Sequence, residues 1–278
     1  FVLCEDANGL SFGGKACANQ FLDNPFTQGI VSGYTSGGDN GTDVIDKFPF
    51  TADANATDVG ELSVTRKRHS GLSSTTDGFV AGGSGAPVGL DSIGKFPFIA
   101  DAPSFDVGEL SDGVQDGSGQ SSSVSGYTAG RLPAADKIQK FPFANGGTGA
   151  SDVGELTNSR GRTAGHSSPS NGYASGGSCG SIPTNCSADT PATNIGNLTQ
   201  TRGYNTGQQS STHGYSTGGI NSPPDTGQRS DVIDKFPFAS SNDNATDVGE
   251  LAVCMNRQSG QSSTTNGYAS GGFFQPPD

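Results

Sequence analysis

Hydrophobic residues are sparse in this chain and recur in short groups separated by Gly, Ser, Thr, Asn and Asp. The most regular group is Lys-Phe-Pro-Phe with Asp-Val-Gly-Glu-Leu a few residues later, and it begins at Lys47, Lys95, Lys140 and Lys235. A degenerate copy, Asn194–Leu198, keeps only the second half. A repeat of about 45 residues lies in the range of solenoids and propellers.

A second group sets the phase of the repeat. An aromatic residue follows a glycine, and two small residues and one or two further glycines come next. The first glycines of the six copies are Gly33, Gly78, Gly126, Gly172, Gly214 and Gly267, spaced 42 to 53 residues apart. The 12 residues from Gly267 onward and the 32 before Gly33 together make one repeat length. We therefore expect six copies, one of them split between the terminal segments, with an incomplete five-unit fragment as the alternative.

Each unit is predicted to contain strands and turns. In the first unit the expected strands are 33–38, 44–50 and 59–64, and 73–77 leads into the next Gly-aromatic strand. Phe48 and Phe50 share one face of their strand and Ile45 takes the other, which suits a sheet covered on both sides. No stretch of ten or more residues has helical periodicity.

This pattern predicts an all-β fold, a β-propeller with six blades of about 42–53 residues. Small residues are expected in the crowded strand near the axis and Phe in the outer strands. The expected domain is 1–278, and it divides into a diverged closing segment at 1–32, repeats near 33–77, 78–125, 126–171, 172–213 and 214–266, and the start of the split repeat at 267–278. A β-solenoid is the alternative fold.

The composition changes this picture little. Only 31% of the 278 residues are hydrophobic and the net charge is −12, which favours disorder, but the regular recurrence of Phe, Val, Ile and Leu argues against it. No basic cluster exceeds Arg66–Arg68, so no nucleic-acid partner is expected. No apolar run approaches the roughly 20 residues of a membrane span, so no membrane insertion is expected.

The cysteines favour an oxidising environment. Cys179 and Cys186 bracket a short loop and are candidates for a disulfide, as are Cys4 and Cys17, with Cys254 left over. Metal binding is the alternative, but no Cys-x2-Cys pair or His partner supports it. An extracellular or virion location therefore fits better than a reducing cytosol.

The unit resembles a kelch-type repeat. In that family an aromatic strand ends in Gly-Gly, a second strand carries an aromatic residue and Pro, and a third leads to an Arg. Here Tyr34 with Gly37-Gly38, then Phe48-Pro49, then Arg66 match this order. The Trp usual in kelch units is absent, and the Leu of each Asp-Val-Gly-Glu-Leu group is expected to take its packing role.

Two residue types are expected to serve the structure. Arg160 and Arg202 match Arg66, whereas Val114 and Met255 stand there in the other repeats. We expect the three arginines to donate structural hydrogen bonds to Glu61, Glu155 or a carbonyl of the next blade, with anion binding as the alternative. The tyrosines of the Gly-Tyr groups are expected to pack between blades, with sugar stacking as the alternative.

A closer resemblance is to predicted structural or tail proteins of marine bacteriophages and environmental viruses. Those proteins carry Lys-Phe-Pro-Phe, Asp-Val-Gly-Glu-Leu, Gln-Ser-Ser and Gly-Tyr-Ala-Ser-Gly-Gly groups in this order, as residues 231–272 do almost completely. The resemblance implies an exposed virion or extracellular protein without a defined ligand.

The sequence does not predict a catalytic site, a metal site or a cofactor. His69, His166 and His213 occupy three different places in the repeat, so no symmetric metal ring follows. No Gly-x-Ser-x-Gly turn has His and Asp partners, so we do not expect an enzyme. Acidic turns offer oxygen ligands for Ca²⁺, but turns that cap their own backbone are the simpler interpretation. These turns are Asp39/Asn40/Asp43, Asp53/Asn55/Asp58 and Asp243/Asn244/Asp247.

Five Asn-x-Ser/Thr sequons would be glycosylation sites in a secreted eukaryotic protein. They are Asn40, Asn55, Asn185, Asn197 and Asn244.

We expect a non-catalytic, virion-displayed structural or receptor-binding propeller, such as a tail fibre, decoration or adhesion module. Its expected partners are other virion or filament subunits and a cell-surface glycan of the host. The glycan would contact the loops that differ most between repeats, 90–92, 132–136 and 178–186, because recognition usually resides in variable loops on a rigid scaffold. The alternative is a secreted, glycosylated adhesin or extracellular filament subunit.

Overall fold

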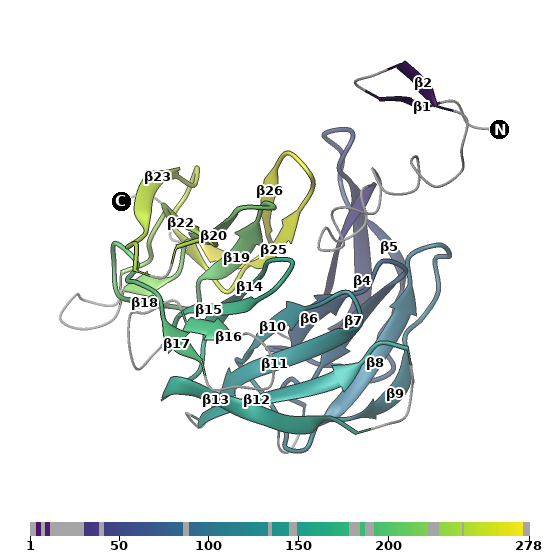
Figure 1. The fold of residues 1–278 in the computed structure, drawn as a ribbon. Coiled ribbons are helices and arrows are strands. Elements are labelled where there is room, and N and C mark those ends of the chain that lie inside the picture. The colour runs from purple at the N-terminus through teal and green to yellow at the C-terminus, as the bar shows by residue number, and fades with distance from the viewer. Residues whose placement is uncertain are drawn as a thin grey trace.

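The computed structural model describes residues 4–6, 9–11, 31–38, 42–85, 89–132, 135–144, 149–177, 184–186, 192–221, 228–240 and 242–274. Within these ranges every regular element is a β-strand (Figure 1), which confirms the all-β prediction. The described part of the chain contains no helix long and apolar enough to cross a membrane.

Four sheets contain four antiparallel strands each. The first consists of β6 (Ser70–Ser73), β7 (Asp77–Ala81), β8 (Ser92–Pro97) and β9 (Phe105–Glu109). The second consists of β10 (Ser118–Ser121), β11 (Ser125–Arg131), β12 (Ala135–Pro142) and β13 (Ser151–Arg160). The third consists of β14 (Thr163–Ser167), β15 (Gly172–Gly176), β16 (Thr184–Cys186) and β17 (Thr193–Asn194). The fourth consists of β19 (Thr206–Gln209), β20 (His213–Thr217), β22 (Val232–Pro237) and β23 (Thr246–Glu250).

The remaining sheets are smaller. A three-stranded sheet consists of β3 (Ser32–Gly38), β4 (Thr42–Pro49) and β5 (Thr57–Glu61). The last repeat contributes the pair β25 (Ser259–Ser262) and β26 (Gly267–Ser270). Shorter pairs are β18 (Arg202–Gly203) with β21 (Ile220–Asn221), β24 (Met255–Asn256) with β27 (Phe273–Phe274), and β1 (Cys4–Asp6) with β2 (Gly9–Ser11).

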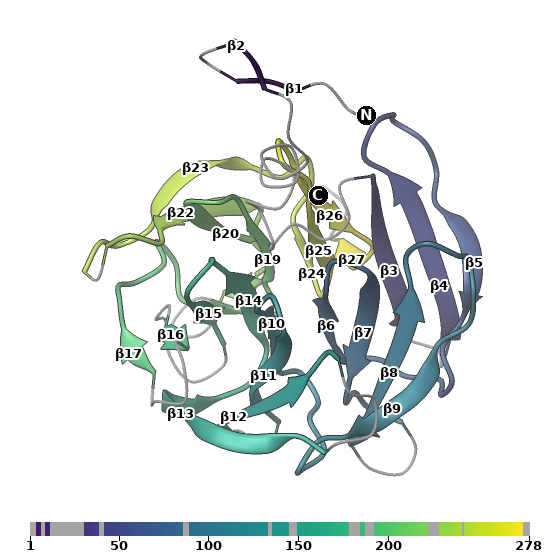
Figure 2. The same ribbon diagram turned by 45° about the vertical axis from the view of Figure 1, so that its right-hand side comes forward.

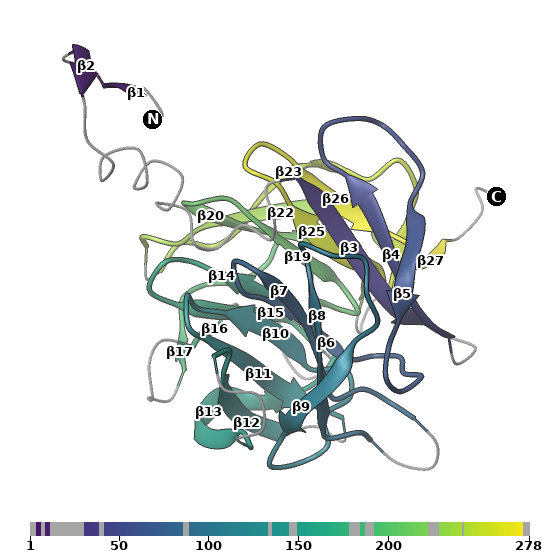
Figure 3. The same ribbon diagram turned by 90° about the vertical axis from the view of Figure 1, so that its right-hand side faces the viewer.

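The sheets are arranged as in a propeller. Figure 2 shows β6, β10, β14, β19 and β25 around the centre, with β5, β9, β13, β17 and β23 at the periphery. Figure 3 shows the β1–β2 hairpin apart from the other sheets. The prediction of six complete blades does not match the described residues, in which four sheets have four strands. Residues 12–30 lie outside those ranges, so completion of the last repeat by the N-terminal segment stays a prediction.

In the four-stranded sheets and in the β25–β26 pair, the innermost strand is a Ser-Gly, Thr-Gly or Thr-Ala-Gly strand that precedes the Gly-aromatic strand. The sequence predicted small residues near the axis but treated 73–77 as a lead-in, whereas the structure places β6 at Ser70–Ser73. The alternation of hydrophobic and polar residues that predicts a strand was weak here, because these strands contain almost no large hydrophobic residue.

The Gly-aromatic strand needs its first glycine because a Phe ring covers it. Gly78 pairs with Phe96 across the sheet, and a Cβ at Gly78 would lie 2.3 Å from the Phe96 ring. The same pairing recurs at Gly33/Phe48, Gly126/Phe141 and Gly214/Phe236. The two groups found in the sequence are therefore two halves of one contact.

The Asp-Val-Gly-Glu-Leu group forms an outer strand that also joins the next sheet. The Asp58 carboxylate accepts a hydrogen bond from the Gly60 N–H at 3.1 Å, and Gly60 has φ +155°. The Glu61 carbonyl accepts a hydrogen bond from Ser104 N at 2.8 Å. A Cβ at Gly60 would lie 2.9 Å from the backbone of Ala102, so only glycine permits this approach.

Aromatic stacking between neighbouring sheets forms much of the core. Tyr34 stacks on Phe98 with ring centroids 4.9 Å apart, and Tyr173 stacks on Phe238 at 4.6 Å. The Tyr173 hydroxyl donates to the Phe238 carbonyl at 3.1 Å. The prediction that the tyrosines of the Gly-Tyr groups pack between blades is confirmed for Tyr34 and Tyr173. Buried clusters such as Leu72, Phe79, Phe141 and Phe143 likewise draw on two sheets, so the core lies in the joints between sheets.

Candidate functional site

The inner strands meet backbone to backbone at a ring of glycines around the axis. A Cβ at Gly119 would lie 2.4 Å from the carbonyl oxygen of Gly71, and a Cβ at Gly165 would lie 2.1 Å from that of Gly119. Gly207 and Gly260 continue the series at 2.2 Å each. We call this series the glycine waist, and at Gly119, Gly165, Gly207 and Gly260 a side chain would collide with the backbone of the neighbouring inner strand.

A belt of side chains joins the inner strands on one side of the glycine waist. Ser73 N donates to Ser121 Oγ at 3.0 Å, and Ser121 N donates to Ser167 Oγ at 3.0 Å. The belt continues from Ser167 N to Gln209 Oε1 at 2.8 Å and from Gln209 N to Ser262 Oγ at 2.9 Å. These hydrogen bonds fix the position of each inner strand along the propeller axis relative to its neighbour.

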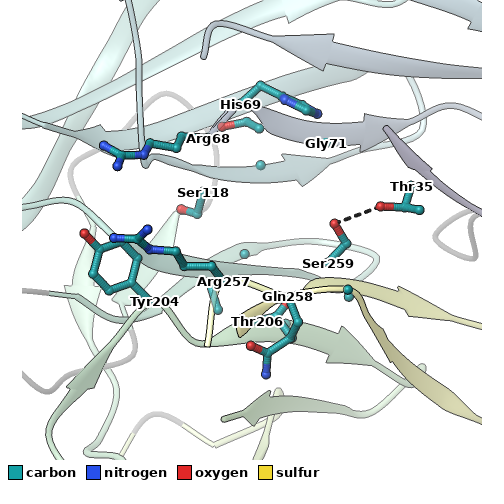
Figure 4. Close-up of a pocket in the computed structure, with 18 of the residues that line it drawn as sticks. Thr35, Arg68, His69, Gly71, Ser118, Tyr204, Thr206, Arg257, Gln258 and Ser259 are labelled. Carbon is teal, nitrogen blue, oxygen red and sulfur yellow. Dashed lines mark hydrogen bonds between the residues drawn. The ribbon is translucent and has the colours of Figure 1, made fainter. Parts of the chain in front are cut away.

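On the other side of the glycine waist lies a cavity of about 480 Å³, a size suited to a small ligand. The hydroxyl-bearing residues Thr35, Ser36, Ser118, Thr206 and Ser259 line its wall. Thr35 Oγ1 donates to Ser259 Oγ at 3.1 Å (Figure 4), so the first and last repeats meet here. We call this space the axial cavity.

The mouth of the axial cavity carries one residue from each of five repeats. We call Arg68, Asp116, Arg162, Tyr204 and Arg257 the mouth ring. Each comes directly before an inner strand, and the backbone joins one to the next. Asp116 N donates to the Arg68 carbonyl at 2.9 Å, Tyr204 N to that of Arg162 at 2.9 Å, and Arg257 N to that of Tyr204 at 3.0 Å.

All five members of the mouth ring have a left-handed backbone. Their φ angles lie between 56° and 63°, a region that costs a non-glycine residue free energy. In the described part of the chain every other residue with positive φ is a glycine. Five side chains are thus held at the mouth in a strained conformation.

Positive charge is concentrated at this mouth although the chain as a whole is acidic. Lys67, Arg68, Arg162 and Arg257 face a single acidic residue, Asp116, among the described residues that line the axial cavity. Arg68 Nη1 lies 3.6 Å from Asp116 Oδ2.

Two of these arginines contact the aromatic ring of Tyr204. The guanidinium carbons of Arg162 and Arg257 lie 4.5 and 4.4 Å from its ring centroid, a distance typical of cation–π contacts. In Figure 4, Arg68 and Arg257 extend towards the same end of the cavity, beside Tyr204.

A serine–histidine pair also lies in the cavity wall. Ser36 Oγ and His69 Nε2 are 3.2 Å apart. Burial, and secondarily the charge of Arg66, lowers the pKa of His69 to about 4, so His69 is neutral and weakly basic at pH 7. Its Nδ1 makes no hydrogen bond to any residue that the structure describes. The pair therefore has no described carboxylate of the kind that orients the histidine of a catalytic triad.

The three arginines singled out by the sequence lie in the joints between sheets, with 1% or less of their surface exposed. Arg66 Nη1 donates to the carbonyls of Gly82 at 2.9 Å and Ser92 at 3.0 Å. Arg202 Nη2 donates to the buried carboxylate of Asp234 at 2.9 Å. Arg160 Nη2 donates to Thr157 Oγ1 at 3.1 Å. Carbonyls were among the partners expected from the sequence, whereas Asp234 was not.

The cysteine pairings cannot be followed in the described residues. Cys17 and Cys179 lie outside them, and of Cys4 and Cys186 only the strand backbone is described, so both disulfides stay predictions. Cys254 is a free, half-buried thiol, and burial together with Asp231 raises its pKa.

Of the sequons, Asn55, Asn197 and Asn244 are exposed. Asn40 lies outside the described residues, and of Asn185 only the backbone within β16 is described. No group of three His, Cys, Asp or Glu side chains that could hold a metal ion occurs among the described residues. In the acidic turns Asp58 and Asp247 accept hydrogen bonds from Gly60 N and Gly249 N at 3.1 Å.

The variable loops begin close to the mouth ring. The Leu90 carbonyl accepts a hydrogen bond from Val114 N at 3.1 Å, and Leu132 N donates to the Gln115 carbonyl at 2.9 Å. Both contacts lie next to Asp116. Residues 178–183 of the third loop lie outside the described residues.

Sequence reasoning missed the mouth ring. The alignment of repeats that identified Arg66, Arg160 and Arg202 places Arg68, Arg162 and Tyr204 two residues further on. The residues at this position of the repeat differ in charge and size, so the periodic pattern did not identify the position as a candidate site. Only the left-handed backbone, which the sequence does not reveal, brings these side chains to one opening.

Comparison with known proteins supports the fold. No protein-family model and no curated protein matches the chain. The solved structure of YjhT is similar with a TM-score of 0.70 at 10% identity, covering 91% of this chain and 93% of that one. At this identity the likeness shows the propeller-like fold alone, and the kelch and bacteriophage resemblances remain expectations.

Proposed function

We propose that the protein is a non-catalytic β-propeller that binds a saccharide in its axial cavity. The observation that carries this proposal is the wall of that cavity, where hydroxyl and amide side chains surround a space of about 480 Å³. Such groups match the hydroxyls of a sugar. The variable loop at 90–92, together with Leu132, would form part of the rim.

We further propose that the ring has six positions. Tyr268 of the last repeat stacks on Phe50 of the first at 4.8 Å, as Tyr173 stacks on Phe238 between neighbouring sheets. Gln261 Nε2 donates to the Tyr34 carbonyl at 3.1 Å, and Gln208 Nε2 donates to the Tyr268 carbonyl at 3.1 Å. These equivalent contacts favour the three-stranded sheet and the β25–β26 pair as neighbours in one closed ring.

We propose a virion or extracellular location, with other virion or filament subunits as partners and a host-surface glycan as ligand. The repeat resemblance and the polar cavity support this setting. The alternative of a secreted, glycosylated adhesin or filament subunit is supported by the exposed sequons Asn55, Asn197 and Asn244.

The test is binding of the full chain to a glycan array. We expect one saccharide class to bind and Ser259→Phe, which places a ring in the axial cavity, to abolish that binding. Ser63→Phe is the control, because Ser63 is exposed and lies away from the cavity wall. Binding that survives Ser259→Phe but is lost when Leu90 is changed would move the site to the loops. Turnover of a bound glycan would overturn the non-catalytic interpretation.

A further inference from the structure

The mouth ring combines identical backbone geometry with unlike side chains. All five residues share a left-handed φ between 56° and 63°, yet they are Arg, Asp, Arg, Tyr and Arg. The adjacent glycine waist, by contrast, is glycine in all five of these repeats. A purely structural position would be expected to hold Gly, Asn or Asp, which adopt this conformation at the least cost, and four of the five residues are none of these. Strain retained at one opening indicates that the side chains themselves serve a function.

The guanidinium groups at this opening are held in place before any ligand arrives. Arg162 and Arg257 contact the ring of Tyr204 at 4.5 and 4.4 Å, and Arg257 also lies 5.6 Å from the ring of Phe273. Asp116 lies beside Arg68. Arginines fixed in this way lose little side-chain entropy when they bind, and their planar donors match the two oxygens of an oxyanion.

We propose that the mouth ring binds the acidic group, a carboxylate or a sulfate ester, of a sugar whose remainder occupies the axial cavity. This inference rests on the proposed function and adds the charge of the ligand to it. Three arginines and Lys67 against one carboxylate leave a net positive mouth on an acidic protein. Tyr204 sets the distance between two of the arginines. Asp116 competes with the ligand for Arg68.

The experiment is calorimetric titration of the full chain with glucuronic acid, galactose 6-sulfate, glucose and galactose. We expect the two acidic sugars to bind at least tenfold more tightly than their neutral counterparts, and this advantage to shrink as salt is raised. A preference between glucuronic acid and galactose 6-sulfate identifies which oxyanion the ring selects.

Two variants that keep the left-handed backbone test the ring itself. Arg257→Asn is expected to lower the affinity for acidic sugars about tenfold and to change that for neutral sugars less than twofold. Asp116→Asn is expected to raise the affinity for acidic sugars severalfold, an increase that a purely structural role would not produce. Lys47→Gln removes the same charge from the outer part of β4 and is expected to change neither affinity.

The outcomes separate the two proposals. Equal binding of acidic and neutral sugars, unchanged in Arg257→Asn and Asp116→Asn, would overturn the anion site and leave the saccharide site standing. Loss of all binding in Ser259→Phe with no effect of the ring variants would do the same. Binding of inorganic sulfate as tight as that of galactose 6-sulfate would show that the sugar makes no contribution, which would overturn the inference as stated.

Discussion

Arginines occur at two positions of the repeat, two residues apart in the chain, and these positions lie in two different regions of the propeller. Arg66, Arg160 and Arg202 are buried in the joints between sheets, where their guanidinium groups donate to carbonyls, hydroxyls and Asp234. Arg68, Arg162 and Arg257 surround the axial opening with a left-handed backbone and retain some exposure.

The difference shows that a shared residue type does not imply a shared role, even within one repeat. In the joint, the buried arginine donates to acceptors inside the protein, so its value is stability. At the mouth, backbone strain adds a cost and the arginines are half-buried or exposed, so stability alone does not explain the residue.

The largest expected effect comes from breaking the joint at its buried ion pair. Arg202 and Asp234 both have fully buried side chains, so Arg202→Ala leaves a carboxylate without its counter-charge. We expect a loss of about 3–5 kcal/mol in the free energy of unfolding, measured by urea denaturation. Arg202→Val with Asp234→Gln reproduces the Val114/Gln139 arrangement of another repeat and should recover much of this loss. If Arg202→Ala were as stable as the parent protein, the distinction between the joint arginines and the mouth arginines would be wrong.

Acid should destabilise the joint through His166. This residue is 1% exposed, and burial lowers its pKa from 6.5 to about 4 although a hydrogen bond to the Gln208 carbonyl opposes the shift. The unfolded chain therefore takes up the proton first, and stability falls as the pH drops from about 6.5 towards 4. The loss is on the order of 3 kcal/mol.

The matched variant is His166→Gln, because Gln stands at the aligned positions 120, 208 and 261. We expect its unfolding midpoint to fall less steeply than that of the parent over this pH range. Parallel curves for the two proteins would show that His166 does not titrate in this way.

A smaller effect is expected at Arg66, which has no carboxylate among its hydrogen-bond partners in the described structure. Arg66→Met introduces the residue found at position 255 and removes the guanidinium donor from the Gly82 carbonyl, while the Ser92 carbonyl keeps its hydrogen bond from Gly82 N. We expect a loss of about 1–3 kcal/mol, seen as a lower thermal midpoint. A loss as large as that of Arg202→Ala would mean that the buried carboxylate is not what distinguishes the two joints.

The smallest effect on stability is expected at the mouth. Arg257→Asn relieves left-handed strain but removes exposed cation–π contacts worth about 0.5–1 kcal/mol each. We expect the free energy of unfolding to change by less than about 1 kcal/mol, measured by the same denaturation, while binding of acidic sugars weakens. A large destabilisation would place Arg257 with the joint arginines.

Much of the fold was readable because its contacts repeat. Phe96 covers Gly78, and Asp58 caps Gly60, so each group in the sequence corresponds to one contact that recurs in several sheets. The innermost strands were harder to predict because Ser-Gly-Gln-Ser has neither large hydrophobic residues nor a clear alternation. The described residues contain four four-stranded sheets, and the count of six rests on terminal segments that are only partly described.

The candidate site could not be predicted from the repeat in the same way. The sequence placed Arg66 by its repeat position and gave it a structural role, but it gave Arg68 no role. Five backbones turned to positive φ bring Arg68, Asp116, Arg162, Tyr204 and Arg257 to one opening, although they are up to 189 residues apart in the chain. No local pattern encodes that convergence.

By itself, the sequence determined the all-β class and the repeat, because these follow from the spacing of glycines and hydrophobic residues. The tertiary structure alone decided which strand lies at the axis, which arginines are buried, and where positive charge collects on an acidic chain. These depend on how the sheets pack around a common centre, and packing brings together residues that the sequence keeps one repeat apart.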